Sequence, residues 1–413
     1  MTYALLTIGT ELTRGDLFNT NASWLAAQLS ALGHEVTTML TVDDDDERLT
    51  QAIKSLVKNH ECLICTGGLG PTSDDLTTAC AAQALNLPLE RDADSLQRIS
   101  ERLEARGLKM TASNEKQALL PRGSTLLGNT HGTAPGFAAR FADCLAVFMP
   151  GVPAEMRPMF QDSVVPLLRA PEHPVATARL RTMGTPEAQI NDRLSDLEAL
   201  YPVSLGYRAS NSEIEVKVQY RGEPGSSTQK AQEEAEKVAD VVAERLADAV
   251  YARGQTTLAE ELGRALLEAK LSFGLAESCT GGLVSHMLTK VPGSSRYYWG
   301  GICSYDNRVK QGLLDVPKEV LQQHGAVSQQ VVELMARGAR RRLGVDVALA
   351  LSGIAGPGGG SADKPIGLVH WAIADEHGTT SDRRVFAGDR LGVQKRAAIH
   401  GLWRTLLHLR NRA

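Results

Sequence analysis

The stretch Cys62–Thr77, CLICTGGLGPTSDDLT, decides the fold that we expect for the N-terminal part of the chain. Its first five residues, Cys62–Thr66, form an apolar run that predicts a buried β-strand. The glycines after this strand predict a turn, and a helix is predicted to follow the turn. Because Cys62 and Cys65 fall within the strand, we interpret them as small buried hydrophobic side chains and not as a zinc or redox pair.

The segments on either side repeat the alternation of strand and helix. Strands are predicted at Tyr3–Ile8, Val36–Val42 and Glu61–Thr66, and helices at Ala22–Leu32 and Glu47–Lys58. Strands separated by helices of this length form βαβ units around a parallel sheet. We therefore predict an α/β domain over residues 1–170.

The composition of the whole chain is typical of a soluble protein with several domains. Its 413 residues exceed what one hydrophobic core supports, and 43% of them are hydrophobic and 22% charged. The net charge of −4 gives no electrostatic footprint for nucleic acid or an acidic membrane. No apolar run reaches the roughly 18–20 residues of a membrane-spanning helix, and the N-terminus lacks a basic signal segment. We expect a cytoplasmic protein that binds neither nucleic acid nor a membrane.

Two further domains are predicted after the change of pattern near Ala170–Pro174. In residues 171–252, Glu213–Tyr220 alternates apolar and polar side chains, as in a sheet that is buried on one face. With helices predicted at Pro186–Leu200 and Thr228–Ala247, this segment is a small α+β domain.

Residues 255–413 open with a capping box at Thr257–Glu260 and then alternate strand and helix again. Strands are predicted there at Ser272–Ala276, Tyr297–Tyr305, Val345–Leu351, Leu368–Ala374 and Arg383–Ala387. This third domain is therefore also predicted to be α/β.

The turn Gly67–Gly70 and the acids after it form the first candidate site. Glycines let a backbone approach an anion, and the start of the next helix adds free N–H groups. Asp74 and Asp75 would repel that anion unless a divalent cation bridges them to phosphate oxygens. Helix capping is the alternative role, although it needs only one acid. Further polar loops follow apolar runs at Asn114–Gln117, Asn129–Gly136 and Pro150–Met156.

The turn Ala276–Gly282, AESCTGG, forms the second candidate site. It lies between a predicted strand and a predicted helix, where Ser278 can present its hydroxyl and later N–H groups can hold an oxyanion or a phosphate. Lys310 is predicted on the first turn of a later helix, and desolvation would lower its pKa and suit it to act as a base. A helix cap at Ser278 and an exposed Lys310 are the alternatives. Cys279 is interpreted as a packing residue.

Two later segments add groups that can bind a ligand. The loop Leu351–Ser361 contains so many glycines that its backbone lies open. Arg390, at the start of the last helix, can pair with a phosphate or with a local acid. The chain has no Gly-x-Ser-x-Gly motif, which disfavours a Ser-His-Asp hydrolase of the usual kind.

In the N-terminal domain these motifs, together with Ile8–Leu12 and Asn19–Asn21, resemble the CinA family, whose first domain is similar to the molybdopterin-binding MoaB/MogA fold. The resemblance implies a metal-dependent ADP-ribose pyrophosphatase in which Asp75, Asp74 and Glu11 hold a divalent cation. Molybdopterin handling, or binding without turnover, is the alternative function. The implied substrate-binding residues are Gly67, Gly68, Gly70, Thr72, Asn114, Lys116, Gly132, Thr133, Gly151 and Glu155, with Lys116 neutralising phosphate charge.

CinA proteins carry a KH-like domain in the middle, and residues 171–252 fit its order of elements. KH domains that bind RNA use a Gly-x-x-Gly loop, for which Gly184–Glu187 is the candidate here, with an acid in place of the second glycine. Residues 171–250 also hold nine Lys and Arg against fourteen Asp and Glu. We therefore expect no RNA binding, and instead a packing role or the interface of a homodimer.

Residues 255–413 resemble the C-terminal CinA domain, whose stand-alone relatives are nicotinamide mononucleotide deamidases. The resemblance implies that Ser278 attacks the carboxamide, that Lys310 moves the proton and that Tyr305 orients the pair, without a metal. The implied substrate-binding residues are Thr280, Gly281, Gly282, Ser352, Gly353, Gly356 and Arg390. We thus expect a bifunctional enzyme of pyridine-nucleotide salvage, with nicotinamide mononucleotide and ADP-ribose as its small-molecule partners.

Overall fold

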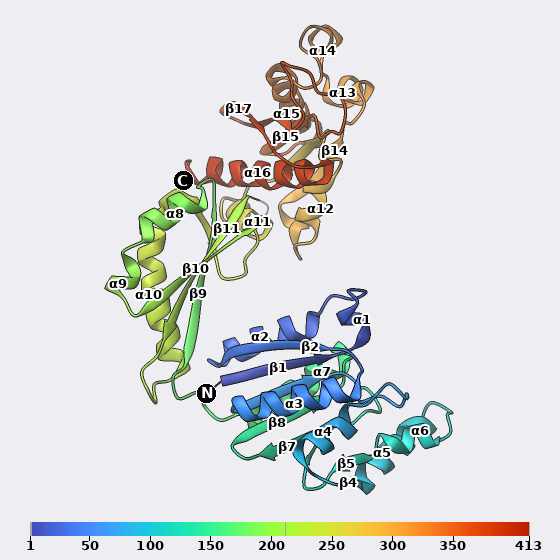
Figure 1. Ribbon diagram of the computed structural model, residues 1–413. Coiled ribbons are helices and arrows are strands. Elements are labelled where there is room, and N and C mark those ends of the chain that lie inside the picture. Colours follow the sequence, from blue (N-terminus) through green and yellow to red (C-terminus); the bar gives the residue numbers. More distant parts are fainter. Residues whose placement is uncertain (1, 211, 413) are drawn as a thin grey trace. The chain divides into compact units, whose positions relative to one another are not determined.

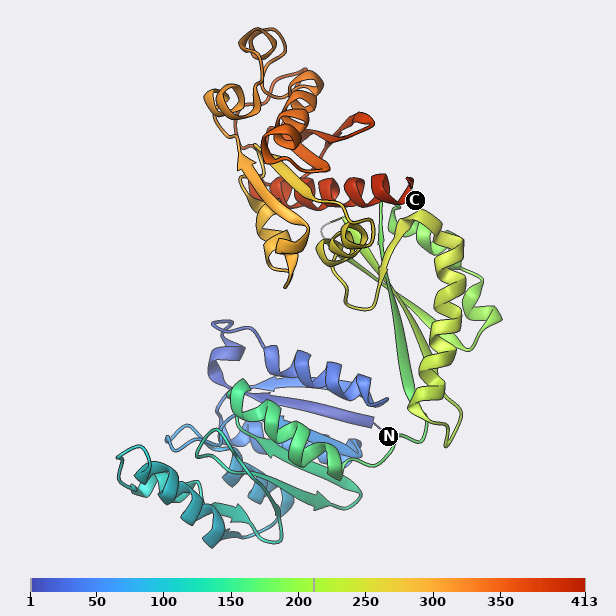
Figure 2. The same ribbon diagram turned by 180° about the vertical axis from the view of Figure 1, so that it is seen from behind.

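The computed structural model describes residues 2–210 and 212–412 and has mixed helices and sheets throughout (Figures 1 and 2). In the N-terminal domain a six-stranded sheet has the order β2-β1-β3-β8-β7-β6. Its strands are β1 (Thr2–Ile8), β2 (Glu35–Val42), β3 (Cys62–Thr66), β6 (Thr125–Leu127), β7 (Gly136–Phe141) and β8 (Cys144–Met149), with β4 (Leu89–Arg91) and β5 (Leu119–Pro121) paired separately. Its helices are α1 (Thr10–Thr13), α2 (Thr20–Ala31), α3 (Asp46–Asn59), α4 (Thr77–Leu85), α5 (Ala93–Glu104), α6 (Ala112–Lys116) and α7 (Pro153–Met159), followed by short π and 3-10 turns at Phe160–Val164 and Val165–Leu167.

Alternate side chains of the central strands divide the N-terminal core into two layers. Leu63 and Cys65 of β3 face the cluster that contains α3 and α4, whereas Cys62 and Ile64 face the cluster that contains α2 and α7. Helices therefore cover both faces of a sheet whose strands β2, β1, β3 and β8 are parallel, as the sequence predicts. Both cysteines are buried on opposite faces of one strand, which confirms that they are packing residues.

The middle domain has a four-stranded sheet of order β10-β11-β9-β12. Its elements are β9 (Val175–Met183), α8 (Glu187–Leu194), α9 (Leu197–Leu200), β10 (Val203–Ser210), β11 (Glu213–Arg221), α10 (Thr228–Leu246), a 3-10 turn (Ala247–Ala249) and β12 (Val250–Arg253). The single helix predicted over Pro186–Leu200 is wrong, because two helices meet at Ser195 and Asp196. The Ser195 hydroxyl donates to the Asp192 carbonyl at 3.1 Å, and Asp196 pairs with Arg245 of α10, so side-chain contacts end the first helix.

The C-terminal domain has a five-stranded sheet of order β14-β13-β15-β16-β17. Its elements are α11 (Leu258–Glu268), β13 (Phe273–Glu277), α12 (Leu283–Thr289), a 3-10 turn (Ser294–Arg296), β14 (Tyr298–Cys303), α13 (Asn307–Leu314), α14 (Lys318–His324), α15 (Gln329–Leu343), β15 (Val347–Gly353), β16 (Leu368–Asp375), β17 (Gly378–Val385) and the long helix α16 (Arg390–Arg410; Figure 2). The predicted strand Arg383–Ala387 lies too far along the chain. Strand β17 begins at Gly378, and as a polar edge strand it lacks the apolar alternation that marks the others.

Two hydrophobic clusters enclose the C-terminal sheet. Leu275 and Leu349 pack toward α11, α12 and α16, whereas Ala276 and Ala348 pack toward α15. Helix α15 comes close to the end of α13, because Gly338 has no side chain to hold the two apart. A Cβ at Gly338 would overlap the backbone carbonyl of Leu314. This close approach fixes α13, the helix that carries Lys310.

Gly338→Ala is expected to destabilise the C-terminal domain by about 1–3 kcal/mol, because a methyl group must displace backbone from a packed core. Gly312→Ala, on α13, is the matched control. A Cβ at Gly312 meets no atom within 4 Å, so alanine should stabilise that helix by roughly 0.5–1 kcal/mol. Differential scanning calorimetry of the full chain measures both shifts. Equal changes in unfolding temperature in the two variants would show that the close contact between Gly338 and Leu314 does not limit the packing of α15 against α13.

Candidate active sites

The C-terminal site lies where β13 and β14 end side by side. These strands are parallel, and the Ser304 N–H donates to the Glu277 carbonyl at 2.8 Å. Ser278 follows β13 directly, and its side chain is 8% exposed. Parallel pairing thus brings Ser278 next to the segment that leads into α13.

Lys310 is buried beside Ser278 and is 1% exposed. Its Nζ lies 3.2 Å from Ser278 Oγ, 2.6 Å from the Ser304 carbonyl and 3.2 Å from the Tyr305 carbonyl. Burial lowers the pKa of Lys310, and no carboxylate forms an ion pair with it within the described residues. The neutral form of the Lys310 amine is therefore more favoured at this site than it would be in bulk water.

The Glu277 carboxylate caps the N-terminus of α12. It is 1% exposed and accepts hydrogen bonds from the N–H groups of Gly282 (3.1 Å), Val284 (3.0 Å) and Ser285 (2.9 Å) and from the Ser285 hydroxyl (2.7 Å). The predicted binding groups Gly281 and Gly282 therefore already have partners, since the Gly281 N–H donates to the Ser278 carbonyl at 3.2 Å. Glu277 was not singled out in the sequence, although a glutamate just before such a turn is a recognisable cap.

The groups that remain available in this turn belong to Cys279 and Thr280. The N–H groups of both residues donate to no backbone carbonyl in the part of the chain that the structure describes and lie against the Cys279 sulfur, and Thr280 Oγ1 is buried without a partner there. The Cys279 thiol is buried, which raises its pKa to about 12 and disfavours the thiolate. Gln394, another residue that the sequence did not reveal, donates to the Cys279 carbonyl at 2.8 Å and holds the turn from α16.

Tyr305 and Arg390 meet at the rim of the site. Arg390 donates to the Tyr305 hydroxyl at 3.0 Å and to the Gly356 carbonyl at 2.7 Å. The Tyr305 side chain is exposed, so this residue reaches Lys310 through its backbone carbonyl and not through its hydroxyl. Arg390 thus links the glycine loop at Gly356 to the residue beside the Ser–Lys pair.

Ser352 and Gly353 lie deeper, at the end of β15. Ser352 is fully buried and donates to the Ala326 carbonyl at 2.7 Å. A Cβ at Gly353 would lie 2.6 Å from the Leu368 carbonyl oxygen, so strand packing requires this glycine. Both residues therefore support the glycine-rich loop that follows β15.

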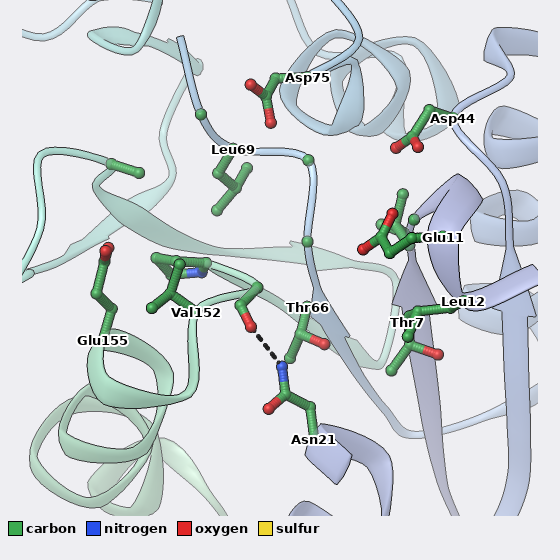
Figure 3. A pocket seen from close by; sticks show the side chains of 18 of the residues that line it. Thr7, Glu11, Leu12, Asn21, Asp44, Thr66, Leu69, Asp75, Val152 and Glu155 are labelled. Atoms are coloured by element: carbon green, nitrogen blue, oxygen red, sulfur yellow. Dashed lines mark hydrogen bonds between the residues drawn. The ribbon is translucent and has the colours of Figure 1, made fainter. Parts of the chain in front are cut away.

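The N-terminal site is a cavity of about 600 Å³ at the carboxyl ends of β1, β3 and β8. Parallel sheets bind ligands at this edge. Glu11 and Asp44 lie together on one side of the cavity, and Val152 and Glu155 lie on the other (Figure 3). Of the predicted residues, those in the lining are Glu11, Gly67, Gly68, Gly70, Asp74, Asp75, Thr133, Gly151 and Glu155. Thr72, Asn114, Lys116 and Gly132 are not part of it.

The glycine turn offers a row of free N–H groups. The Gly67 N–H donates to the Met149 carbonyl at 3.0 Å, whereas those of Gly68, Leu69 and Gly70 have no acceptor among the residues described. Successive free N–H groups on a turn form an anion-binding concavity. Two buried amide oxygens of the lining, Asn21 Oδ1 and Gln117 Oε1, also lack partners.

The residues outside the lining support those within it. The Thr72 N–H and hydroxyl both donate to Asp75 Oδ2, and Lys116 Nζ donates to the carbonyls of Thr72 (3.0 Å) and Asp75 (2.8 Å). Asn114 caps its own helix α6 through a capping box with Thr111. These contacts fix the loop that carries Asp75.

Glu155 is held in a similar way from the opposite wall. Asn129 donates to Glu155 Oε2 at 2.7 Å and accepts from the Gly132 N–H at 2.7 Å. Arg102 donates to the carbonyls of both Asn129 (3.0 Å) and Gly132 (2.6 Å). Through these backbone hydrogen bonds, Gly132 helps to position the loop that faces Glu155.

The carboxylates of the N-terminal cavity suit a cation in type but do not form a closed metal site. No three His, Cys, Asp or Glu side chains converge on one point in residues 2–210 and 212–412. Mg²⁺ in phosphate sites keeps several waters and takes only one or two carboxylates together with substrate phosphates. The lining carboxylates, with Glu11, Asp74 and Asp75 among them, are donors of the type that such a cation takes.

The Gly184–Glu187 segment of the middle domain connects β9 and α8. Gly184 has a φ of +87°, and a Cβ there would lie 2.5 Å from the Trp403 ring on α16. Gly184 itself stays exposed, so the Trp403 ring limits only the side on which a Cβ would lie.

Three family models match the chain in succession. They describe a probable molybdopterin binding domain (residues 4–170), a damage-inducible protein CinA KH domain (177–252) and a CinA C-terminal domain (255–409). A CinA-like protein of Geobacter sulfurreducens is 41% identical over 410 residues, which cover 97% of this chain and 98% of that protein. A putative competence-damage inducible protein of Symbiobacterium thermophilum is 39% identical over 96% of both chains.

The chain therefore belongs to the CinA family, as its motifs predict, and the predicted three-part fold is confirmed. Domains of the molybdopterin-binding and CinA types are associated with enzymatic functions. A solved structure of a competence/damage inducible protein from Agrobacterium tumefaciens is 38% identical over 38% of this chain and 97% of its own, with a TM-score of 0.35. Within the described residues, no helix is long and apolar enough to span a membrane.

Glu277→Gln is expected to destabilise the C-terminal domain by about 2–3 kcal/mol, because an amide nitrogen would face N–H donors that now share a buried carboxylate. Glu268→Gln is the control, since it removes an exposed ion pair with Arg264 and should change stability by at most about 0.5 kcal/mol. Thermal unfolding of the full chain measures both. A Glu277→Gln protein as stable as the control would mean that the cap does not fix the turn.

Proposed function

We propose that the C-terminal domain is an amidase that converts nicotinamide mononucleotide and water to nicotinate mononucleotide and ammonia. The observation that carries this proposal is the 3.2 Å contact between Lys310 Nζ and Ser278 Oγ at a buried site. A neutral lysine has two N–H bonds and one lone pair. The carbonyls of Ser304 and Tyr305 accept the two hydrogens, so the lone pair is left for the Ser278 hydroxyl.

In the proposed reaction Lys310 takes the proton from Ser278 as the hydroxyl oxygen attacks the carboxamide carbon. Lys310 then gives this proton to the nitrogen that leaves as ammonia, and an ester to Ser278 remains. Water attacks the ester while Lys310 removes its proton, and that proton returns to Ser278. The N–H groups of Cys279 and Thr280, with the unpartnered Thr280 hydroxyl, are the donors for the oxyanion.

Arg390 and the loop at Gly356 are proposed to bind the phosphate of the mononucleotide. The helix α12 N-terminus is filled by Glu277 and would repel a phosphate. Arg390 is a cation on the rim, where it donates to the Tyr305 hydroxyl at 3.0 Å. It would bind as a fork of N–H donors.

Ser278→Ala is expected to lower kcat for ammonia release by about a thousandfold or more, because the nucleophile is removed. Lys310→Arg should do the same, since a guanidinium stays protonated. In the unchanged enzyme kcat/KM should rise with pH up to the lowered pKa of Lys310 and then level off, because only the neutral amine can take the proton. Ammonia release measured from neutral to alkaline pH tests these expectations.

Lys318→Arg, at the exposed start of α14, and Cys279→Ala are the controls and should keep the rate and its pH profile. Full activity in Ser278→Ala, or a large loss in Cys279→Ala alone, would assign the nucleophile elsewhere.

We further propose that the N-terminal cavity hydrolyses the pyrophosphate of ADP-ribose with a divalent cation. The charge of the lining supports this proposal. Glu11, Asp44, Asp74, Asp75 and Glu155 line the cavity, and none of the described Lys, Arg or His residues does so. The negative charges of a diphosphate and of the five carboxylates repel each other. A diphosphate can therefore bind here only together with a cation that offsets the charge of both groups.

In this proposal the free N–H groups of Gly68, Leu69 and Gly70 bind phosphate oxygens, and Asp75 and Glu11 hold the cation. Bound there, the cation would polarise the phosphoryl group and lower the pKa of a water molecule. Thr72 and Lys116 keep the Asp75 loop in place. The second candidate function is binding of a nucleotide or pterin without turnover at the same cavity.

Asp75→Asn is expected to lower cation-dependent AMP release from ADP-ribose by about a hundredfold or more, because the amide loses the charge that binds the cation. The amide oxygen can still accept from Thr72, so the loop should survive. Asp94→Asn, at an exposed position in the first turn of α5, is the control and should change nothing. Ammonia release at the other site should remain intact in both variants, and unchanged AMP release in Asp75→Asn would refute the cation assignment.

A further inference from the structure

Three large apolar side chains are exposed at the mouth of the N-terminal cavity. Leu17 is 61% exposed, Phe18 94% and Val152 53%, and all three line the cavity. Leu17 and Phe18 follow β1, whereas Val152 follows β8. Exposed apolar groups gathered at one cavity point to a ligand that covers them.

The backbone that carries Phe18 is held firmly. The N–H groups of Asp16 and Leu17 donate to the Glu11 carbonyl at 2.9 and 3.3 Å, and the Thr20 N–H donates to the Phe18 carbonyl at 2.8 Å. The next residue, Asn19, caps α2 and donates to Thr7 Oγ1 at 2.7 Å. The Phe18 ring thus projects outward from a fixed segment, which suits a platform for a flat ligand.

The rest of the cavity has the opposite character. Within the described parts of the chain, the turn Gly68–Gly70 offers N–H groups without an acceptor, and Asn21 Oδ1 and Gln117 Oε1 are buried acceptors without a partner. A ligand that satisfies all these groups has an apolar flat face, N–H donors on its edge and an anionic end. An aminated heteroaromatic ring joined to phosphate has this combination of properties.

We propose that Phe18 is the platform on which the planar heteroaromatic ring of the ligand stacks, while its phosphates bind at Gly68–Gly70. This inference rests on the proposed N-terminal function in one respect: it assumes that the ligand is a phosphate compound that carries a ring. An adenine and a pterin share this chemistry, and separate ligands distinguish them. Stacking on an aromatic side chain tolerates either ring, because each has a flat π face.

The test is equilibrium binding to the full chain in the presence of Mg²⁺. The ligands are AMP, a phosphorylated pterin and the ring-free ribose 5-phosphate. Phe18→Ala should weaken binding of the ring-bearing ligand by about ten- to a hundredfold, and Phe18→Tyr should restore it. Ribose 5-phosphate should bind equally well to all variants. Leu108→Ala, which removes a 55% exposed side chain that does not line the cavity, is the matched control and should bind every ligand normally.

Equal weakening of ring-bearing and ring-free ligands would overturn the proposal, as would unchanged binding in Phe18→Ala or a change of oligomeric state in that variant without ligand. The hydrolytic function is judged separately. If AMP binding depends on Phe18 but ADP-ribose is not cleaved, stacking stands and the pyrophosphatase fails. If ADP-ribose is cleaved with the same KM in Phe18→Ala, the pyrophosphatase stands and stacking fails.

Discussion

The buried carboxylate of Glu277 organises the C-terminal domain at the point where its chemistry is proposed. It satisfies N–H groups at the start of α12 that would otherwise attract an anion. The turn is therefore closed before any ligand binds, and Ser278 is left with Lys310 as its contact. Had the carboxylate pointed toward Lys310, an ion pair would have kept the lysine protonated. With Glu277 turned toward α12, desolvation is the largest influence on the pKa of Lys310 and lowers it.

The two candidate sites carry opposite kinds of charged side chain. Five carboxylates line the N-terminal cavity, and no basic side chain lines it among the described residues, so a cation is proposed to accompany an anionic ligand. The C-terminal site buries one lysine, and burial lowers the pKa of that lysine more than the nearby Asp306 raises it. Both sites nevertheless lie at the carboxyl ends of parallel strands, where loops from neighbouring strands meet.

This shared placement explains how much could be predicted from the sequence. Alternating strands and helices predict parallel sheets, and parallel sheets place the ends of successive strands at one edge. Ser278 and Lys310 could be paired on that basis, although they are far apart in the chain, whereas Glu11 was grouped with Asp75 only through the resemblance to the CinA family. The antiparallel strands could not be placed in the same way. Strand β17 is polar and pairs with β16 alone, and β7 lies between β6 and β8 with antiparallel pairing on both sides.

The role of an individual side chain was harder to predict, as two lysines show. Lys116 and Lys310 each donate to two backbone carbonyls, of Thr72 and Asp75 in one case and of Ser304 and Tyr305 in the other. Lys116 is only partly buried and keeps a structural bond to its loop, whereas Lys310 is 1% exposed and touches a serine hydroxyl. Sequence motifs give the type and order of such residues. Desolvation, which comes only from packing, decides which lysine is suited to act as a base.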